Sequence, residues 1–212
     1  SELSANVIDL CPVGALTSRP YAFVARPWEL TKVESVDVTD AQGANIRIDA
    51  RGAQVLRVLP RLNEKINEEW ISDKARYSID GLRRQRLDRP YLRGADGRLH
   101  PASWSDALEA IKKVMKKAKP SQIGAIAGDQ VDAESMFALK SLFDKIGIPH
   151  IDCRQDGAKL NARQRSSYLF NSTIEGIDEA DALLIVGSNP RIEAPVMNAR
   201  IRKRCLTSRL SV

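Results

Sequence analysis

The sequence contains few of the residues from which self-contained metal sites and disulfide frameworks are built. Its 212 residues include three widely spaced cysteines and two histidines, with neither a CxxC nor an HxxxH pattern. An odd number of dispersed cysteines argues against a secreted disulfide scaffold. A zinc finger and a self-contained ferredoxin are excluded as well, because each needs four closely spaced ligands.

Long apolar runs and aromatic residues are scarce too. No run approaches the roughly 20 apolar residues needed to cross a bilayer. Aromatic residues make up 5% of the chain, and the net charge of +6, from 33 basic and 27 acidic residues, is dispersed along it. A single-strand nucleic-acid binder would need more stacking residues and clustered basic charge. The composition therefore favours a solvated basic surface, with a basic nucleic-acid-binding module as the alternative.

What is present is the composition of a folded globular protein, 43% hydrophobic and long enough for one large or two small domains. We predict three parts: an irregular, proline-punctuated segment over residues 1–30, a small β-rich unit with a linker over residues 31–100, and an α/β domain over residues 101–212. The chain opens at Ser1 without a signal-peptide profile. It also lacks an initiator Met, so we expect a processed chain or a fragment of a longer one.

Alternating residues and turn chemistry predict a three-stranded antiparallel meander in the second part. Its strands are expected at residues 33–38, 45–49 and 55–59. Val36 and Val38 share one face of the first strand. Ser72 can cap a short helix that runs to about Leu82, and residues 94–97 read as a hairpin tip or loop.

From Ser103 onward, helical and strand-like segments alternate, which predicts the start of a parallel, Rossmann-like sheet with flanking helices. Ser103 fits a capping box, and apolar residues from Leu108 to Ala118 line one face of the helix that follows. Strands are expected at residues 123–128, 148–152 and 182–187, and further helices around residues 136–146, 158–170 and 190–204. The third strand is apolar throughout, as in a parallel strand buried on both faces.

The turn from Gly187 to Pro190 has the shape that receives a phosphate at a helix N-terminus. The sequence contains no GxGxxG pattern and no Walker loop, so a tight strand-to-helix connection is favoured over dinucleotide or pterin binding. Cys153 is interpreted as a buried or half-buried structural thiol. The basic residues of the last helix are interpreted as its solvated face; they are Arg200, Arg202, Lys203 and Arg204.

One motif carries chemistry, the segment DLCPVGAL at residues 9–16. A cysteine followed directly by proline often closes the ligand run of a ferredoxin-type cluster. The thiolate binds iron, Pro12 would direct the chain away from the cluster, and small residues would let backbone N–H groups approach the sulfur. Cys–Pro pairs are common, so the spacing alone leaves both a cluster ligand and an ordinary cysteine open for Cys11.

The longer context resembles the G-subunit family of NADH:quinone oxidoreductase, respiratory complex I, over about residues 1–204. The segments that carry the resemblance are VIDLCPVGALTS at 7–18, PYAF at 20–23, RPWEL at 26–30, LPRLNE at 59–64, NEEWISDK at 67–74 and VGSNPR at 186–191.

In that family the cysteine of the CPVGAL segment is the last of four thiolates that hold a 4Fe-4S cluster. The resemblance implies that Cys11 is this ligand, and that the other three lie upstream, outside this sequence. Arg19 and Arg26 lie near Cys11 in the sequence and are candidates for raising the cluster's potential, with surface ion pairs as the alternative.

The part after residue 30 resembles the molybdopterin-oxidoreductase module that this family shares with formate dehydrogenases and nitrate reductases. True molybdoenzymes of that group usually place cluster-binding cysteines in the small β unit, whereas residues 31–100 contain none. The resemblance therefore implies a scaffold without molybdopterin. A fragment of a molybdopterin-dependent, formate-dehydrogenase-like enzyme is the alternative. The residues after 204 do not resemble the family, which indicates a truncation or a shifted reading frame.

The function implied is that of a fragment of the complex I iron–sulfur subunit, which passes electrons from NADH via FMN and iron–sulfur clusters toward quinone. The expected partners are the other peripheral-arm subunits, including the FMN- and NADH-binding subunit. No nucleic acid is expected, and the membrane is reached only through the complex. The expected location is the cytoplasmic side of the bacterial inner membrane, or the matrix side in a mitochondrion. The isolated chain is expected to be inactive.

Overall fold

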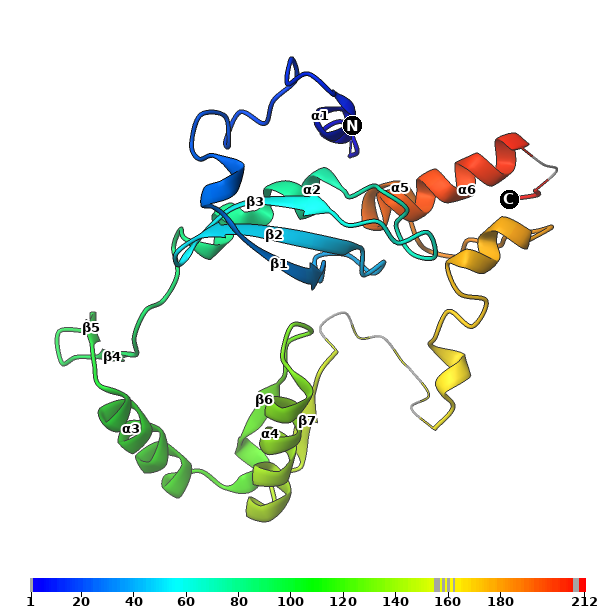
Figure 1. Cartoon of the computed structure of the whole chain (residues 1–212). Coiled ribbons are helices and arrows are strands. Elements are labelled where there is room, and N and C mark those ends of the chain that lie inside the picture. The colour runs from blue at the N-terminus through cyan, green and yellow to red at the C-terminus, as the bar shows by residue number, and fades with distance from the viewer. Residues whose placement is uncertain (1, 155–156, 158, 160, 162, 208–209) are drawn as a thin grey trace. The chain divides into compact units, whose positions relative to one another are not determined.

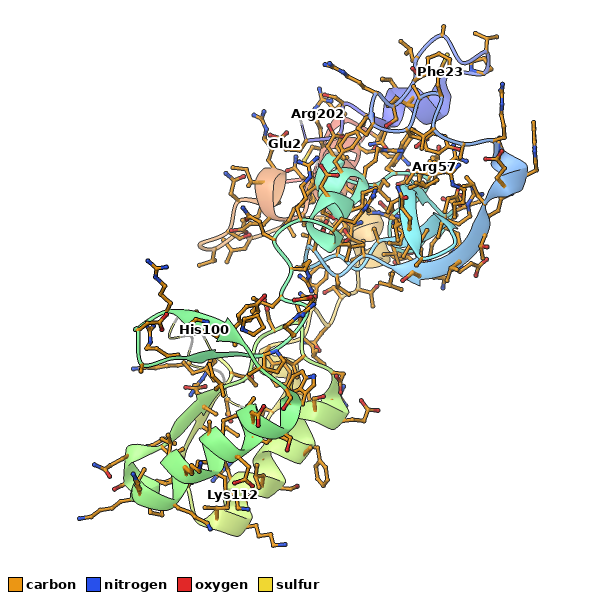
Figure 2. All side chains as sticks on the ribbon, turned by 90° about the vertical axis from the view of Figure 1, so that its left-hand side faces the viewer. Glu2, Phe23, Arg57, His100, Lys112 and Arg202 are labelled. Atoms are coloured by element: carbon orange, nitrogen blue, oxygen red, sulfur yellow. The ribbon has the colours of Figure 1, made fainter. Side chains whose placement is uncertain are left out.

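The computed structural model describes residues 2–154, 157, 159, 161, 163–207 and 210–212. The chain divides into two compact units, the first comprising residues 1–85 and 168–212 and the second residues 86–167. Each unit contains helices and strands (Figure 1), which confirms the predicted α/β class. Figure 2 shows Arg57 on the first unit and His100 on the second.

A three-stranded antiparallel meander forms the sheet of the first unit, as predicted. Its strands, in the order β1-β2-β3, are β1 (Thr31–Val36), β2 (Asn45–Arg51) and β3 (Gln54–Pro60). The hairpin between β2 and β3 turns at Gly52, whose φ of +58° is the left-handed conformation that such tight turns use. β1 is an edge strand that ends at Val36, so the prediction that the strand reaches Val38 is wrong, and both valines are exposed outside the core.

The core of the first unit forms between this sheet and the segment after it, with Ile71 fully buried at its centre. α2 (Asp73–Tyr77) begins at Ser72, whose Oγ accepts a hydrogen bond from the N–H of Ala75 at 3.0 Å. The chain continues as the 3₁₀ helix η2 (Ser78–Leu82), so the helical stretch has the predicted bounds. The core residues are Ala44, Ile46, Val58, Ile71 and Ala75.

A fully buried carboxylate lies in the same sheet. Asp49 accepts hydrogen bonds from Nε of Arg47 at 2.9 Å and from Nε of Arg57, its neighbour in β3, at 2.7 Å. Burial acts to raise the pKa of Asp49, but the hydrogen bonds from Arg47 and Arg57 outweigh it, and the net pKa lies below its ordinary value. The buried charge therefore depends on both arginines.

The last helical stretch begins at Pro190, as predicted, and runs as α5 (Pro190–Glu193) and α6 (Pro195–Thr207). The break falls at Ala194, because a residue before proline is excluded from helical geometry. The prediction that its basic residues form a solvated face is wrong for Arg200, which is 4% exposed and ion-paired with Asp178 at 2.6 Å. Arg204 is half-buried and donates to the carbonyl of Ala180, while Arg202 and Lys203 are exposed.

The predicted third parallel strand at residues 182–187 is wrong. Of this segment only Ala182 forms a bridge, with Ser211, and Leu184 and Val186 are 86% and 79% exposed. A strand buried on both faces needs neighbouring strands and covering side chains along its length. The segment belongs to the first unit, whereas the parallel strands among the described residues belong to the second. The 3₁₀ helix η5 (Glu175–Glu179) precedes it.

The second unit contains the other predicted elements. The hairpin tip at residues 94–97 joins β4 (Tyr91–Arg93) to β5 (Leu99–Pro101), and β6 (Gly124–Ile126) pairs in parallel with β7 (His150–Asp152). The helices are α3 (Trp104–Lys117), the 3₁₀ helix η3 (Pro120–Gln122) and α4 (Ala133–Ile146).

The helices of the second unit differ in how far their apolar residues are buried. α3 is capped by Ser103, as predicted, but its apolar face is exposed, with Leu108 and Val114 at 59% and 67%. α4 buries Phe143. The helix predicted at residues 158–170 lies partly outside the described residues; within them, only the 3₁₀ helix η4 (Arg165–Ser167) forms there. None of the helices in the described parts of the chain is long and apolar enough to cross a membrane.

We expect Asp49→Asn to lower the free energy of unfolding by about 2 kcal/mol, because Arg47 and Arg57 would lose a buried charged partner. Since the pKa of Asp49 is lowered in the fold, its contribution is complete above about pH 4 and is lost as the pH falls below that value. Urea unfolding followed by circular dichroism at several pH values measures both effects.

The matched control is Glu34→Gln, which removes an exposed carboxylate from the same sheet. Glu34 pairs with Arg61 at 3.2 Å and is 71% exposed, so the expected change is below about 0.5 kcal/mol. Equal losses in the two variants would contradict the assignment of Asp49 as a buried structural charge.

Candidate functional site

Cys11 lies where a short helix ends. α1 (Asn6–Leu10) places Cys11 at its C-cap, where the Cys11 N–H donates to the carbonyl of Val7 at 3.2 Å. Cys11 has extended backbone geometry, with φ −76° and ψ 111°, as expected for a residue that precedes proline. Pro12 therefore ends the helix and turns the chain into residues 13–16, which fold back toward the sulfur.

Backbone N–H groups of this turn stabilise the Cys11 thiolate. The N–H of Leu16 donates to Sγ at 3.4 Å. The N–H groups of Leu16 and then Val13 lower the pKa of the Cys11 thiol most, burial opposes them, and those of Ala15 and Gly14 add to the lowering. The segment therefore favours a thiolate, which is the form that binds metal. Cys11 is itself half-buried.

Gly14 provides the turn with its conformation. Its φ is +66°, in the left-handed region that residues with a Cβ rarely occupy. No atom lies within 4 Å of the position where a Cβ would be, so the requirement is one of backbone geometry and not of space.

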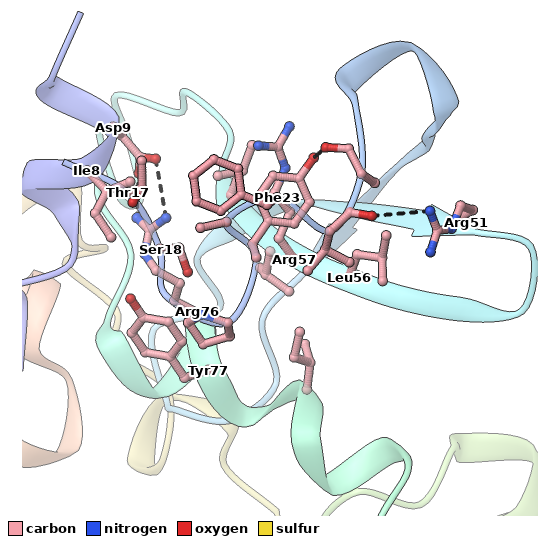
Figure 3. A pocket seen from close by; sticks show the side chains of 18 of the residues that line it. Ile8, Asp9, Thr17, Ser18, Phe23, Arg51, Leu56, Arg57, Arg76 and Tyr77 are labelled. Atoms are coloured by element: carbon pink, nitrogen blue, oxygen red, sulfur yellow. Dashed lines mark hydrogen bonds and ion pairs between the residues drawn. The ribbon is translucent and has the colours of Figure 1, made fainter. Parts of the chain in front are cut away.

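A cavity of about 820 Å³ lies beside this segment, within the first unit. Figure 3 shows its walls, which come mainly from α1, residues 16–26, β3 and the α2–η2 stretch. Arg57 stacks over the ring of Tyr21, with 4.3 Å between its Cζ and the ring centroid, and so links residues 16–26 to the sheet. The 3₁₀ helix η1 (Pro27–Glu29) follows and contributes Glu29, which pairs with Arg51.

The other predicted residues lie apart from Cys11 or lack a binding geometry. Arg19 and Arg26 are both exposed, and neither forms an ion pair within the described ranges. Their effect on a cluster stays a prediction. Cys153 is exposed, so the prediction of a buried or half-buried thiol is wrong. Cys153 comes directly after β7, which belongs to a two-stranded sheet, and among the described residues no further strand extends that sheet.

The turn from Gly187 to Pro190 forms with φ +65° at Gly187. The N–H of Asn189 and the hydroxyl of Ser188 both donate to the carboxylate of Glu193. The carboxylate of Glu193 thus accepts the hydrogen bonds that a phosphate would need. This favours a tight strand-to-helix connection over a phosphate-binding turn.

No group of three or more potential metal ligands gathers anywhere in the described part of the chain. Cys11 is thus a single thiolate donor, and its N–H surroundings fit one corner of an iron–sulfur cluster but not a complete site. Sequence reasoning missed the buried residues that fix the helix before it, Asn6 and Arg76. Neither belongs to a recognisable motif, so their role becomes visible only when distant segments pack together.

Comparison with known proteins bears on this site. Residues 30–80 match the NADH-ubiquinone oxidoreductase NDSU1/NuoG-like, 4Fe-4S domain, and residues 86–212 match molybdopterin oxidoreductase. The chain is 59% identical over 203 residues to the mitochondrial NADH dehydrogenase (ubiquinone) iron-sulfur protein 1 of Solanum tuberosum. It is 54% identical over 212 residues to the NADH-quinone oxidoreductase G-subunit of Rickettsia conorii. The chain belongs to the molybdopterin oxidoreductase family, and it matches G-subunits of NADH-quinone oxidoreductase over part of their length.

The same similarity extends to a fungal protein, the mitochondrial NADH-ubiquinone oxidoreductase 78 kDa subunit of Candida albicans, which is 53% identical over 216 residues. These three alignments cover 96% to 100% of this chain but only 28% to 31% of the relatives. The chain therefore spans about 30% of the length of the curated relatives it matches. The 4Fe-4S domain match begins after Cys11 and contains no cysteine.

We expect the Cys11 thiol to be alkylated by iodoacetamide with a pH midpoint below that of an ordinary thiol, because backbone N–H groups stabilise the thiolate. Mass spectrometry of a variant that keeps only this cysteine, with Cys153→Ser and Cys205→Ser, measures the midpoint. In concentrated urea the turn is lost, and the midpoint should rise. An unchanged midpoint on unfolding would contradict the assignment.

We further expect Gly14→Ala to raise the pKa of Cys11 back toward the ordinary value, since alanine in the left-handed region costs roughly 1 kcal/mol and opens the turn. The control is Gly81→Ala, because Gly81 has open space around its Cβ position and no positive φ. Alkylation profiles that shift equally in both variants, or in neither, would show that the turn does not set the pKa.

Proposed function

We propose that this chain is part of a complex I iron–sulfur subunit and that Cys11 donates one thiolate to a 4Fe-4S cluster. The observation that carries the proposal is the hydrogen bond from the Leu16 N–H to Sγ, in a turn whose backbone N–H groups lower the thiol pKa and in a chain that matches G-subunits. Such donors are typical around the sulfurs of iron–sulfur sites, where they tune the reduction potential. The activity proposed for the whole protein is electron transfer from NADH toward quinone.

The chain's own residues would act on position and electrostatics. The cluster, when bound, supplies one-electron transfer. Pro12 and Gly14 shape the turn, Leu16 and Val13 direct N–H groups at the sulfur, and the thiolate of Cys11 serves as ligand. The other three ligands would come from outside this sequence. Arg19 and Arg26 are proposed to raise the potential as exposed positive charges near the ligand.

We propose that the chain has three functional parts. Residues 1–30 are the end of the cluster-binding segment. The other two form a scaffold, with residues 31–100 as the small β unit and linker and residues 101–212 as the Rossmann-like domain. We propose that no molybdopterin binds, and the occupation of the Gly187–Pro190 turn by Glu193 supports this. The names of the relatives favour this assignment over a formate-dehydrogenase-like enzyme.

The proposed partners are other subunits of complex I, including the one that binds FMN and NADH, with no nucleic acid. We propose a peripheral position on the cytoplasmic side of the bacterial inner membrane, or on the matrix side in mitochondria. The names of the relatives support partnership within that complex.

The test is Cys11→Ala in the complete subunit within the assembled complex. We expect one 4Fe-4S signal to disappear from the electron paramagnetic resonance spectrum of the reduced protein, because a thiolate ligand is lost. Cys153→Ala is the matched control, since Cys153 is exposed and belongs to the second unit; its spectrum should be unchanged. A full set of signals in the Cys11 variant would refute the proposal.

A further inference from the structure

We infer that Arg76 is a positioning residue for Cys11: its buried guanidinium fixes α1 against α2 and thereby determines where the Cys11 sulfur lies. The inference rests on the proposed function, because it concerns the cluster that Cys11 would bind. It gives residues 30–80, which match the 4Fe-4S domain but contain no cysteine, a role in holding the ligand in place.

Arg76 is a buried charge whose partners all lie in α1. The residue is 4% exposed. Its Nη1 donates to Asp9 Oδ1 at 3.3 Å, and its Nη2 donates to Asp9 Oδ2 and, at 3.3 Å, to Asn6 Oδ1. Its Nε meets no acceptor among the described residues. Figure 3 shows Arg76 and Asp9 facing each other beside the cavity. The guanidinium is therefore oriented by α1 alone.

Asn6 adds a second set of contacts between the same two segments. It is 5% exposed, its Nδ2 donates to the carbonyl of Ile71 at 2.8 Å, and its Oδ1 accepts from the N–H of Ile71 at 3.2 Å. Next to it, the N–H of Ala5 donates to Asp73 Oδ1 at 2.9 Å. These bonds bring together residues 65 to 70 positions apart in the sequence. α1 cannot shift along residues 71–76 without breaking several of them.

The sulfur follows the position of α1. α1 has five residues, and a helix of that length is not stable by itself, so its place is set by its tertiary contacts. Asp9 lies two residues before Cys11, which caps the same helix. When the contact with Arg76 is lost, the sulfur and its N–H donors should move relative to the other ligands. Losing such outer contacts typically lowers metal affinity about 10-fold to 100-fold.

The experiment compares Arg76→Met with Arg76→Lys in the complete subunit within the assembled complex. The cluster is defined by the paramagnetic resonance signal that Cys11→Ala removes. For Arg76→Met we expect about 10-fold faster loss of that signal under a chelator, an altered line shape and a shifted midpoint potential. Lysine keeps the positive charge near Asp9, so Arg76→Lys should restore part of each property. Asp9→Asn, which conserves shape, should change them in the same direction by less, and it decides the matter where Arg76→Met does not fold.

The matched control is Arg200→Met. Arg200 is equally buried at 4%, belongs to the same unit and pairs with Asp178 at 2.6 Å, a residue outside α1. We expect it to lower the unfolding temperature while leaving line shape and midpoint unchanged. Wild-type spectra and chelation rates in the Arg76 and Asp9 variants, or equal changes in Arg200→Met, would overturn the inference. If Cys11→Ala removes no signal, the proposed function fails instead, whatever the Arg76 variants do.

Discussion

The burial of Arg76 between α1 and α2 is the constraint on which the N-terminal part of the first unit depends. A guanidinium taken out of water is costly unless its donors find acceptors, and here Asp9 and Asn6 supply acceptors to both Nη groups. Residues 5–11 therefore form an integral part of the packed unit. Ile71, fully buried in the sheet's core, extends that constraint to the meander.

Buried charges join distant segments at two further places in the same unit. Asp49 fixes Arg57, and Arg57 in turn stacks on Tyr21, so that residues 16–26 are attached to the sheet. Arg200 joins α6 to Asp178 and to the carbonyl of Glu64. The hydrogen bonds of each pair have fixed directions, so each pair allows only one arrangement of the two segments. Apolar contacts alone would define that arrangement less sharply. Among the described residues, the core cluster of this unit has five buried members, so the unit depends strongly on such pairs.

The sequence predicted the local features of this fold well, because their causes are local. Period-two alternation identified the meander. The caps at Ser72 and Ser103 were predictable because a serine hydroxyl accepts a hydrogen bond from a backbone N–H that has no partner within the first turn of a helix. The predictions that failed concern residues whose contacts come from distant parts of the sequence. Residues 182–187 have the composition of a buried strand, but composition does not supply the neighbouring strand. Arg200 looks like any surface arginine until Asp178 is brought beside it.

The candidate site likewise has local features that the sequence predicts and distant contacts that it does not. The turn from Pro12 to Leu16 prepares a thiolate from contiguous residues, so the motif alone pointed to the chemistry of Cys11. The place of that thiolate depends on Asn6 and Arg76, which contact each other across 70 positions and belong to no pattern. The proposed cluster would need both properties in its ligand. Local N–H groups favour the thiolate of Cys11, and a rigid contact with the rest of the fold would fix where that thiolate lies.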